Sequence, residues 1–341
     1  MKTVISILCA AIAIPSAALA NDAPLKPGKP VDYKTLAFYP KKWTAGGHAT
    51  ELVPWEGEAL IFLASGGDQD PAVMSTFVGN LDAGWKLYAD LTGAQPRPHK
   101  ILEGKPTIAA VPNGTTCGYG CGYVGATGIE MTHFHDGHLP AVTKNPKAVP
   151  HAYFYEMGRN YFTFGRRHDC FTTGFAVFMR YVCMDSLDLH DIDKGTRETI
   201  FAAIGAYEKS DLPFLRTFTN ADGLSEKQNR LKTSPTDQPV MYASAMLHLW
   251  KTHGDDWLRR FYRQLATCPP ANAKSKDGAQ QQCYHWLLAA SCAAKADLSP
   301  TFVDKWRLEL TPEQKTELAG VDWEAADLKA GAIAAAEIKA R

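Results

Sequence analysis

Short apolar runs of the kind that form β-strands occur only in the first part of the 341-residue chain, at 59–63, 107–111 and 127–131. Between them apolar residues recur at helical spacing, and from Thr199 onward the sequence has an almost wholly helical pattern. This order predicts an α+β fold, with a small mixed sheet and helices first and a mostly helical half afterwards. The boundary is expected near residues 195–210.

The expected helices have recognisable ends. Asp70-Pro71 starts one that Gly93 terminates, and Pro150 opens the next, from His151 to about Phe164. Further helices are expected at 171–184, 241–250, 255–265 and 283–294. The polar stretch from 269 to 282, which begins with Pro269-Pro270, is expected to form a surface loop.

The N-terminus has the pattern of an export signal. Lys2 precedes an apolar stretch over 4–18, and Ala18-Leu19-Ala20 places small residues at the two positions that a signal peptidase reads. We therefore expect a signal peptide over 1–20, with cleavage after Ala20, and a secreted or periplasmic protein. No later run reaches the roughly 20 apolar residues of a membrane span, so none is expected.

The charge balance gives no sign of a polyanionic partner. The chain has 36 Lys and Arg against 36 Asp and Glu. Without an overall positive field, binding to nucleic acid or to an anionic membrane surface is not expected.

Seven of the eight cysteines follow the apolar N-terminal stretch and are disulfide candidates in an oxidising compartment. Cys117 with Cys121 would close a tight loop. Cys268 with Cys283 would tie the polar loop, and Cys170 with Cys183 would join two segments across a helix. Sequence alone leaves the pairing open, with one thiol left over.

Three segments together carry a resemblance to a known class. Gly128-Ile129-Glu130-Met131 is followed by a loop, by Tyr155-Glu156-Met157-Gly158-Arg159-Asn160, and then by Thr172-Thr173-Gly174-Phe175-Ala176. This order resembles the gluzincin metallopeptidases, particularly the M60-like (enhancin-related) group and the basic secretory proteins. In those families the first helix contains His-Glu-x-x-His and the second supplies a third ligand. Segments 255–261, 289–291 and 297–302 are similar to their C-terminal bundle.

The resemblance covers most of residues 55–320 and implies a division of the chain. A lead-in over 21–50, expected to be extended, precedes a zincin-like α+β domain over 51–200. A helical domain over 201–320 and an Ala-rich tail over 321–341 follow. The active-site cleft would run between the two halves.

The metal ligands of that class are replaced here. Tyr155 and Arg159 stand where the two histidines belong, and Thr173 stands at the third position; only Glu156, the general-base position, remains. A guanidinium is permanently charged and cannot ligate a cation. We therefore expect no zinc peptidase activity, no bound metal and no cofactor.

The residues that remain on this helix suggest other chemistry. His151, Tyr155 and Arg159 recur every four residues and share one face, next to Glu156. Tyr155 and Glu156 could form an acid/base pair, and Arg159 could hold the carboxylate of a uronate. His151 and two residues outside this helix, Glu130 and His135, are expected to help bind the substrate, an extracellular glycan or peptide.

One alternative gives this helix no catalytic role. Arg159 could form a salt bridge with Glu156 or Glu130 that fills the space left by the metal. The protein would then be a pseudopeptidase that binds or scaffolds without turnover.

A histidine-rich segment offers a third possibility. Thr132-His133-Phe134-His135-Asp136-Gly137-His138 superficially resembles the His-x-His-x-Asp-His motif of metallo-β-lactamase-type hydrolases, but Asp136 lies one position early. A metal-dependent hydrolase would need His133, His135 and His138 to converge. A solvent-facing loop beside the cleft is favoured instead.

Overall fold

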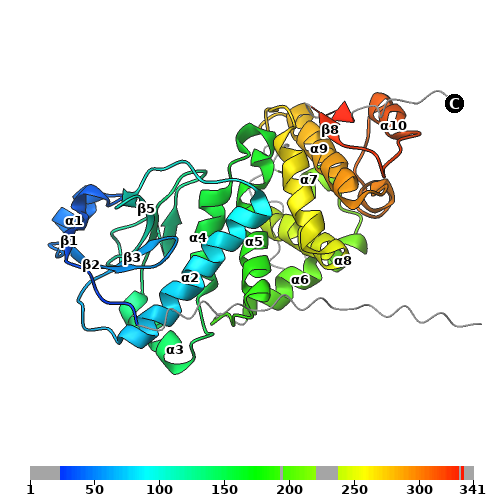
Figure 1. Cartoon of the computed structure of the whole chain (residues 1–341). Helices are drawn as coiled ribbons and strands as arrows, with labels where there is room; N and C mark the ends of the chain where they lie inside the picture. The colour runs from blue at the N-terminus through cyan, green and yellow to red at the C-terminus, as the bar shows by residue number, and fades with distance from the viewer. Residues whose placement is uncertain (1–23, 193–194, 220–236, 330–331, 334–341) are drawn as a thin grey trace, which may run out of the picture.

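The computed structural model of the chain describes residues 24–192, 195–219, 237–329 and 332–333. The signal-peptide prediction for residues 1–20 lies outside them. The described part confirms the α+β class: a small mixed sheet occupies the N-terminal half and a helical assembly the C-terminal half, side by side in Figure 1.

The sheet has the strand order β1-β2-β3-β5-β7-β6, with β4 pairing β5 at one end. Its central strands, β3, β5 and β7, are parallel, whereas β2 and β6 run antiparallel to their neighbours. β6 is therefore an antiparallel strand at the edge. The strands are β1 (Val31–Asp32), β2 (Glu51–Glu56), β3 (Ile61–Ala64), β4 (Ile101–Leu102), β5 (Lys105–Ala110), β6 (Gly120–Gly122) and β7 (Ile129–Met131).

The two faces of the sheet are both buried, which explains why the central strands are apolar runs rather than alternating ones. Phe62, Ile108 and Met131 point into the large core shared with the helices. Residues in between, such as Leu63 and Ala109, point to the opposite face, where a smaller cluster is closed by the N-terminal segment.

The helices are α1 (Pro40–Ala45), α2 (Pro71–Thr92), α3 (Leu139–Lys144), α4 (His151–Tyr161), α5 (Thr172–Ser186), α6 (Gly195–Glu208), α7 (Phe214–Phe218), α8 (Gln238–Ala266), α9 (Lys276–Ala294) and α10 (Pro312–Leu318). α2 begins at the predicted Asp70-Pro71 cap, and Gly93 ends it in a left-handed conformation. α8 contains both segments expected at 241–250 and 255–265, joined across non-helical Gly254.

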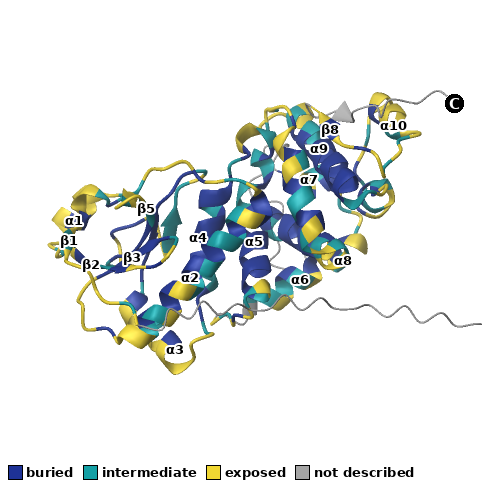
Figure 2. Ribbon diagram, in the orientation of Figure 1, coloured by how far each residue is buried: buried dark blue, intermediate teal, exposed yellow. Residues whose placement is uncertain are grey.

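One continuous apolar cluster links the two halves. It runs from Trp55 through α2, α4 and α5 to Trp286 on α9 and Leu328 near the C-terminus. Figure 2 shows the same arrangement, with buried segments in the sheet and inner helices and exposed ones on α1, α3 and α10. The predicted halves are thus distinct in secondary structure but share a core.

Three expectations about connecting segments differ from the structure. The lead-in is not extended throughout, because Trp43 and its neighbours form α1 and pack under the sheet. The loop expected over 269–282 is shorter, because Ser275 caps α9 and the helix begins at Lys276. Near the C-terminus, β8 (Leu328–Lys329) pairs with β9 (Ala332–Ile333), and the rest of the expected tail lies partly outside the described residues.

The Cys117–Cys121 disulfide is confirmed. The other two suggested pairs are wrong: Cys170, Cys183, Cys268, Cys283 and Cys292 carry free thiols. Cys170 precedes α5 and Cys183 lies near its other end, so the thirteen residue steps between them span roughly 20 Å along the axis at about 1.5 Å per residue. A disulfide needs Cα atoms within about 7 Å. Cys283 lies two turns inside α9, and its thiol and that of Cys268 are both free.

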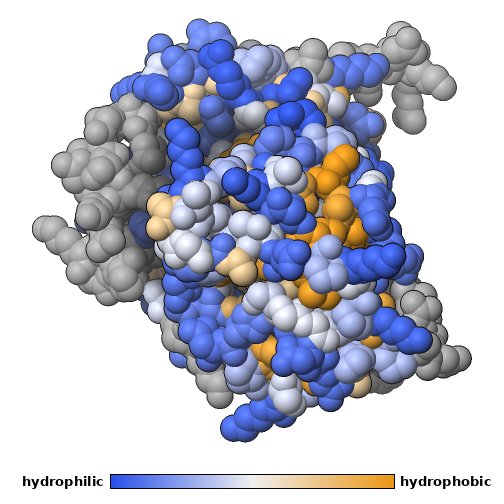
Figure 3. Space-filling view, turned by 90° about the vertical axis from the view of Figure 1, so that its left-hand side faces the viewer, coloured by the Kyte–Doolittle hydropathy of each residue, from blue (hydrophilic) through white to orange (hydrophobic). Residues whose placement is uncertain are grey.

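Figure 3 turns the α1 and β1 end of the molecule toward the viewer, and this face is mainly hydrophilic, with a large hydrophobic area on the right of the view and smaller ones below it. Within the described residues, no helix combines the length and the apolar composition needed to cross a bilayer.

Candidate functional site

α4 presents the residues that the sequence singled out. Its apolar side chains, such as Phe154 and Met157, enter the core, whereas His151, Tyr155 and Arg159 are only half-buried. Their four-residue spacing places them on one accessible face of the helix, as expected.

Glu156 lies beside this face, against the edge strand β6. It is 7 % exposed. A Cβ added to Gly122 would lie 2.9 Å from Oε2 of Glu156 and 2.8 Å from its backbone oxygen, so only glycine lets the strand approach this closely. Burial raises the pKa of Glu156 to about 7, against the opposing effects of the Arg159 charge and a hydrogen bond from the Gly122 backbone.

A carboxyl group with a pKa near 7 can both take up and release a proton at neutral pH. Among the ion pairs of the described residues, none joins Glu156 to Arg159. The salt bridge suggested as a purely structural role is therefore not formed, and neither is the one to Glu130.

Arg159 instead donates from Nη1 to the Thr173 hydroxyl on α5 over 3.4 Å. α4 and α5 approach closely at this level, because Gly158 packs on Ala176. Tyr155 lies one turn away on α4, its ring centroid 6.0 Å from the guanidinium carbon of Arg180. The accessible face thus carries a phenol flanked by two cationic side chains.

The residues at the three ligand positions of the gluzincin resemblance do not fit a zinc ion. The guanidinium of Arg159 occupies the position of a ligand, and its contact with Thr173 leaves two hydrogen-bonding groups and a positive charge where a cation would have to lie. Elsewhere in the described part of the chain, no three His, Cys, Asp or Glu side chains gather as metal ligands would.

The structure brings only some of the predicted site residues together. His151, at the start of α4, bonds Asp191 through Nδ1 at 2.8 Å and remains on the Tyr155 face. Glu130 lies on the opposite face of the sheet, where its Oε1 accepts hydrogen bonds from the Tyr33 hydroxyl and the Phe38 backbone. Burial raises the pKa of Glu130.

The three histidines after β7 do not converge. Their segment forms a π-helical turn over Phe134–His138 rather than a loop. His138 is buried between the hydroxyls of Tyr119 and Tyr153, at 2.5 and 2.9 Å, and burial lowers its pKa to about 4. His133 bonds Asp136.

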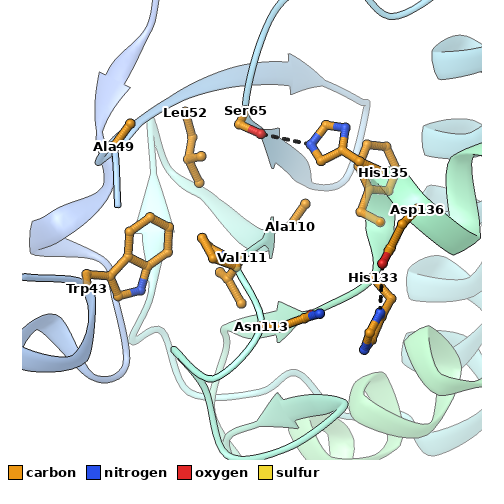
Figure 4. A pocket seen from close by; sticks show the side chains of 12 residues that line it. Trp43, Ala49, Leu52, Ser65, Ala110, Val111, Asn113, His133, His135 and Asp136 are labelled. Carbon is orange, nitrogen blue, oxygen red and sulfur yellow. Dashed lines mark hydrogen bonds and ion pairs between the residues drawn. The ribbon is translucent and has the colours of Figure 1, made fainter. Parts of the chain in front are cut away.

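His135 points to a different neighbour, Ser65. Its Nε2 lies 2.8 Å from the Ser65 hydroxyl, at the rim of a cavity of about 290 Å³ (Figure 4). The cavity lies where the parallel strands β3, β5 and β7 end, with Ser65, Asn113 and His135 following the three strands in turn. The crevice outside the carboxyl ends of parallel strands is a common place for ligands.

Sequence reasoning missed this cavity apart from its histidines. Trp43 falls within the lead-in that is expected to be extended, and Ser65 directly follows β3. The signal in the sequence is a polar residue within four positions after each of the three predicted strands, namely Ser65, Asn113 and His135. Trp43 lines the cavity fully buried, and within the described residues its indole nitrogen has no hydrogen-bond partner, which costs about 1–3 kcal/mol unless water or a ligand supplies one.

Comparisons with known proteins establish a shared fold and no more. No family model and no curated protein matches the sequence. A crystal structure of a mutant of a functionally unknown conserved protein from Bacillus anthracis matches with a TM-score of 0.51 at 13% identity, over 78% of this chain and 50% of that one. Another structure, described as a functionally unknown conserved protein from that organism, matches with a TM-score of 0.49 at 13% identity. That match covers 81% of this chain and 52% of the other. The chain spans about half the length of these proteins.

Proposed function

We propose that this protein is exported and acts on an extracellular acidic glycan at the accessible face of α4. The observation that carries the proposal is Glu156, a nearly buried carboxyl group with a pKa of about 7 beside the edge strand and one residue from half-buried Tyr155. The zincin-like arrangement seen in the sequence would then be repurposed, with its metal chemistry lost.

The proposed chemistry is cleavage next to a uronate. Elimination needs a base that removes the proton adjacent to the carboxylate, an acid that protonates the leaving oxygen, and a cation that neutralises the carboxylate. Glu156 and Tyr155 supply the two proton-transfer groups. Arg159 supplies the cation, since its guanidinium can bind a carboxylate in bidentate fashion.

The surroundings support an extended polymer as the ligand. β6 is an edge strand of the sheet, so an extended chain can lie along its outer side. Tyr119, 49% exposed in the disulfide-closed turn before β6, offers a ring on which a sugar can stack. Glu130 is not part of the proposed site, because it lies across the sheet.

The experiment is to incubate the purified protein with uronate-containing polysaccharides and follow two products. Elimination creates a conjugated double bond that absorbs in the ultraviolet, whereas hydrolysis creates reducing ends without it. Glu156→Gln should lower either activity by at least about 100-fold, the usual contribution of a general acid or base. Glu130→Gln, a buried carboxyl on the other face, is the matched control and should keep activity. Equal activity of wild type and Glu156→Gln would overturn the proposal.

A second candidate, a pseudopeptidase that binds without turnover, is favoured by one observation. Glu156 is only 7 % exposed, so a substrate atom reaches it only if the α4 face opens. Calorimetric binding of an acidic oligosaccharide, lost in Arg159→Gln and unaccompanied by any product, would select this function over the enzymatic one.

A further inference from the structure

The cavity at the ends of the parallel strands contains a pair of side chains that the α4 face does not use. Ser65 follows β3 and His135 follows β7, and the hydroxyl of Ser65 lies 2.8 Å from Nε2 of His135 (Figure 4). A serine hydroxyl within hydrogen-bond reach of an imidazole nitrogen is the arrangement of an activated nucleophile and its base.

We propose that Ser65 and His135 form a second catalytic site, a serine nucleophile with its general base, which cleaves short-chain esters. The substrate class follows from the cavity. Its volume of about 290 Å³ is at the lower end of the range for ligand pockets, roughly 300–1,000 Å³. It accommodates a short acyl group, and the alcohol portion remains outside.

The lining of the cavity suits this substrate. Leu52, Ala110 and Val111 are buried and form an apolar floor for the acyl chain. Trp43 is buried beside them and adds its ring to this apolar lining. Ser65 and His135 are exposed at the rim, where an ester bond can reach them.

The electrostatics around His135 favour a base rather than a cation. Partial burial lowers its pKa, while Asp68 and Asp136, the two carboxylates that face it, act in the opposite direction. The ring is therefore neutral at pH 7, and in the tautomer with its proton on Nδ1 the Nε2 atom accepts a hydrogen bond from the Ser65 hydroxyl.

The reaction balances with water as the only co-reactant. Ser65 Oγ forms a bond to the ester carbonyl carbon as its proton passes to His135 Nε2. The ester C–O bond then breaks, and His135 returns that proton to the leaving alkoxide. Water attacks the acyl-serine through the same base, which releases the carboxylic acid and restores the Ser65 hydroxyl.

The test combines a covalent probe with an ester series. A fluorophosphonate should modify Ser65, identified by peptide mass, and p-nitrophenyl acetate should be hydrolysed faster than the long-chain palmitate. Ser65→Ala and His135→Asn should each reduce hydrolysis by at least about 100-fold. His248→Asn is the matched control, because His248 is an exposed histidine on α8 and does not line the cavity; the activity of this variant should stay within about twofold of wild type.

The outcomes separate this site from the one on α4. Glu156→Gln should leave ester hydrolysis unchanged, and Ser65→Ala should leave glycan cleavage unchanged. Absence of probe on Ser65, or unchanged hydrolysis by a folded Ser65→Ala protein, overturns the ester-cleaving site. Because both rim residues are exposed, matching circular dichroism spectra are expected for all variants.

Discussion

Arg159 on α4 donates a hydrogen bond to Thr173 on α5 over 3.4 Å, so two side chains fourteen positions apart meet across the helix pair. They occupy the second and third ligand positions of the gluzincin resemblance, and Tyr155 occupies the first, one turn away on α4. The three positions thus lie on two packed helices, and none of their side chains is a usual zinc ligand.

This relationship predicts that the zinc site can be rebuilt. The triple variant Tyr155→His, Arg159→His, Thr173→Glu should bind about one zinc ion per chain after dialysis, because imidazoles at i and i+4 and a carboxylate on the adjacent helix form a three-ligand set. Wild-type protein should retain none. Elemental analysis of both proteins measures this, and equal zinc content would show that these positions do not correspond to a metal site.

Glu156 should make the protein less stable as the pH rises. The unfolded carboxyl loses its proton above about pH 4.5, whereas the folded one keeps it until about pH 7. The folded state therefore loses about 3 kcal/mol relative to the unfolded state across this window. Glu156→Gln should remove that loss. The free energy of unfolding in urea of the variant, relative to that of wild type, should therefore be larger at pH 8 than at pH 4. If the free energies of unfolding of wild type and variant changed with pH in parallel, the raised pKa of Glu156 would be contradicted.

His138 should have the opposite pH dependence. Its unfolded imidazole takes up a proton below about pH 6.5, but the folded one does so only near pH 4. Stability is lost as the pH falls through this window, about 2 kcal/mol between pH 7 and pH 5. In denaturant titrations, the free energy of unfolding of His138→Gln should fall less between pH 7 and pH 5 than that of wild type does. The difference should be about 2 kcal/mol. Burial also lowers the pKa of His168 to about 3 and of His285 to about 4, but these two histidines are present in both proteins, so their contributions cancel from the difference.

The close approach of α4 and α5 can be tested at Gly158. A Cβ there would lie 2.8 Å from the Cα of Ala176, so the helices must move apart, and Gly158→Ala should destabilise the protein by about 1–3 kcal/mol. Gly79→Ala on α2 is the control: nothing lies within 4 Å of its added Cβ, and it should stabilise by roughly 0.5–1 kcal/mol. Thermal unfolding gives the change in melting temperature of each variant relative to wild type. Equal changes for Gly158→Ala and Gly79→Ala would refute the tight contact between α4 and α5.

The face of α4 could be predicted from sequence, because helical spacing alone places His151, Tyr155 and Arg159 together. The side of the sheet on which Glu130 lies could not. Alternation predicts that Glu130 points away from Ile129 and Met131, but not which side α4 covers. The cavity residues Trp43, Ser65 and Asn113 come from segments far apart in the chain. Only the parallel order β3, β5, β7 brings them together, and no local pattern encodes that order.

The apolar cluster that runs from Trp55 to Leu328 has a consequence for how the protein folds. Neither the sheet-containing half nor the helical half can bury its inner surface alone, because each supplies the other's interior. The chain should therefore unfold in a single cooperative transition, and fragments cut near residue 195 should aggregate rather than behave as autonomous modules.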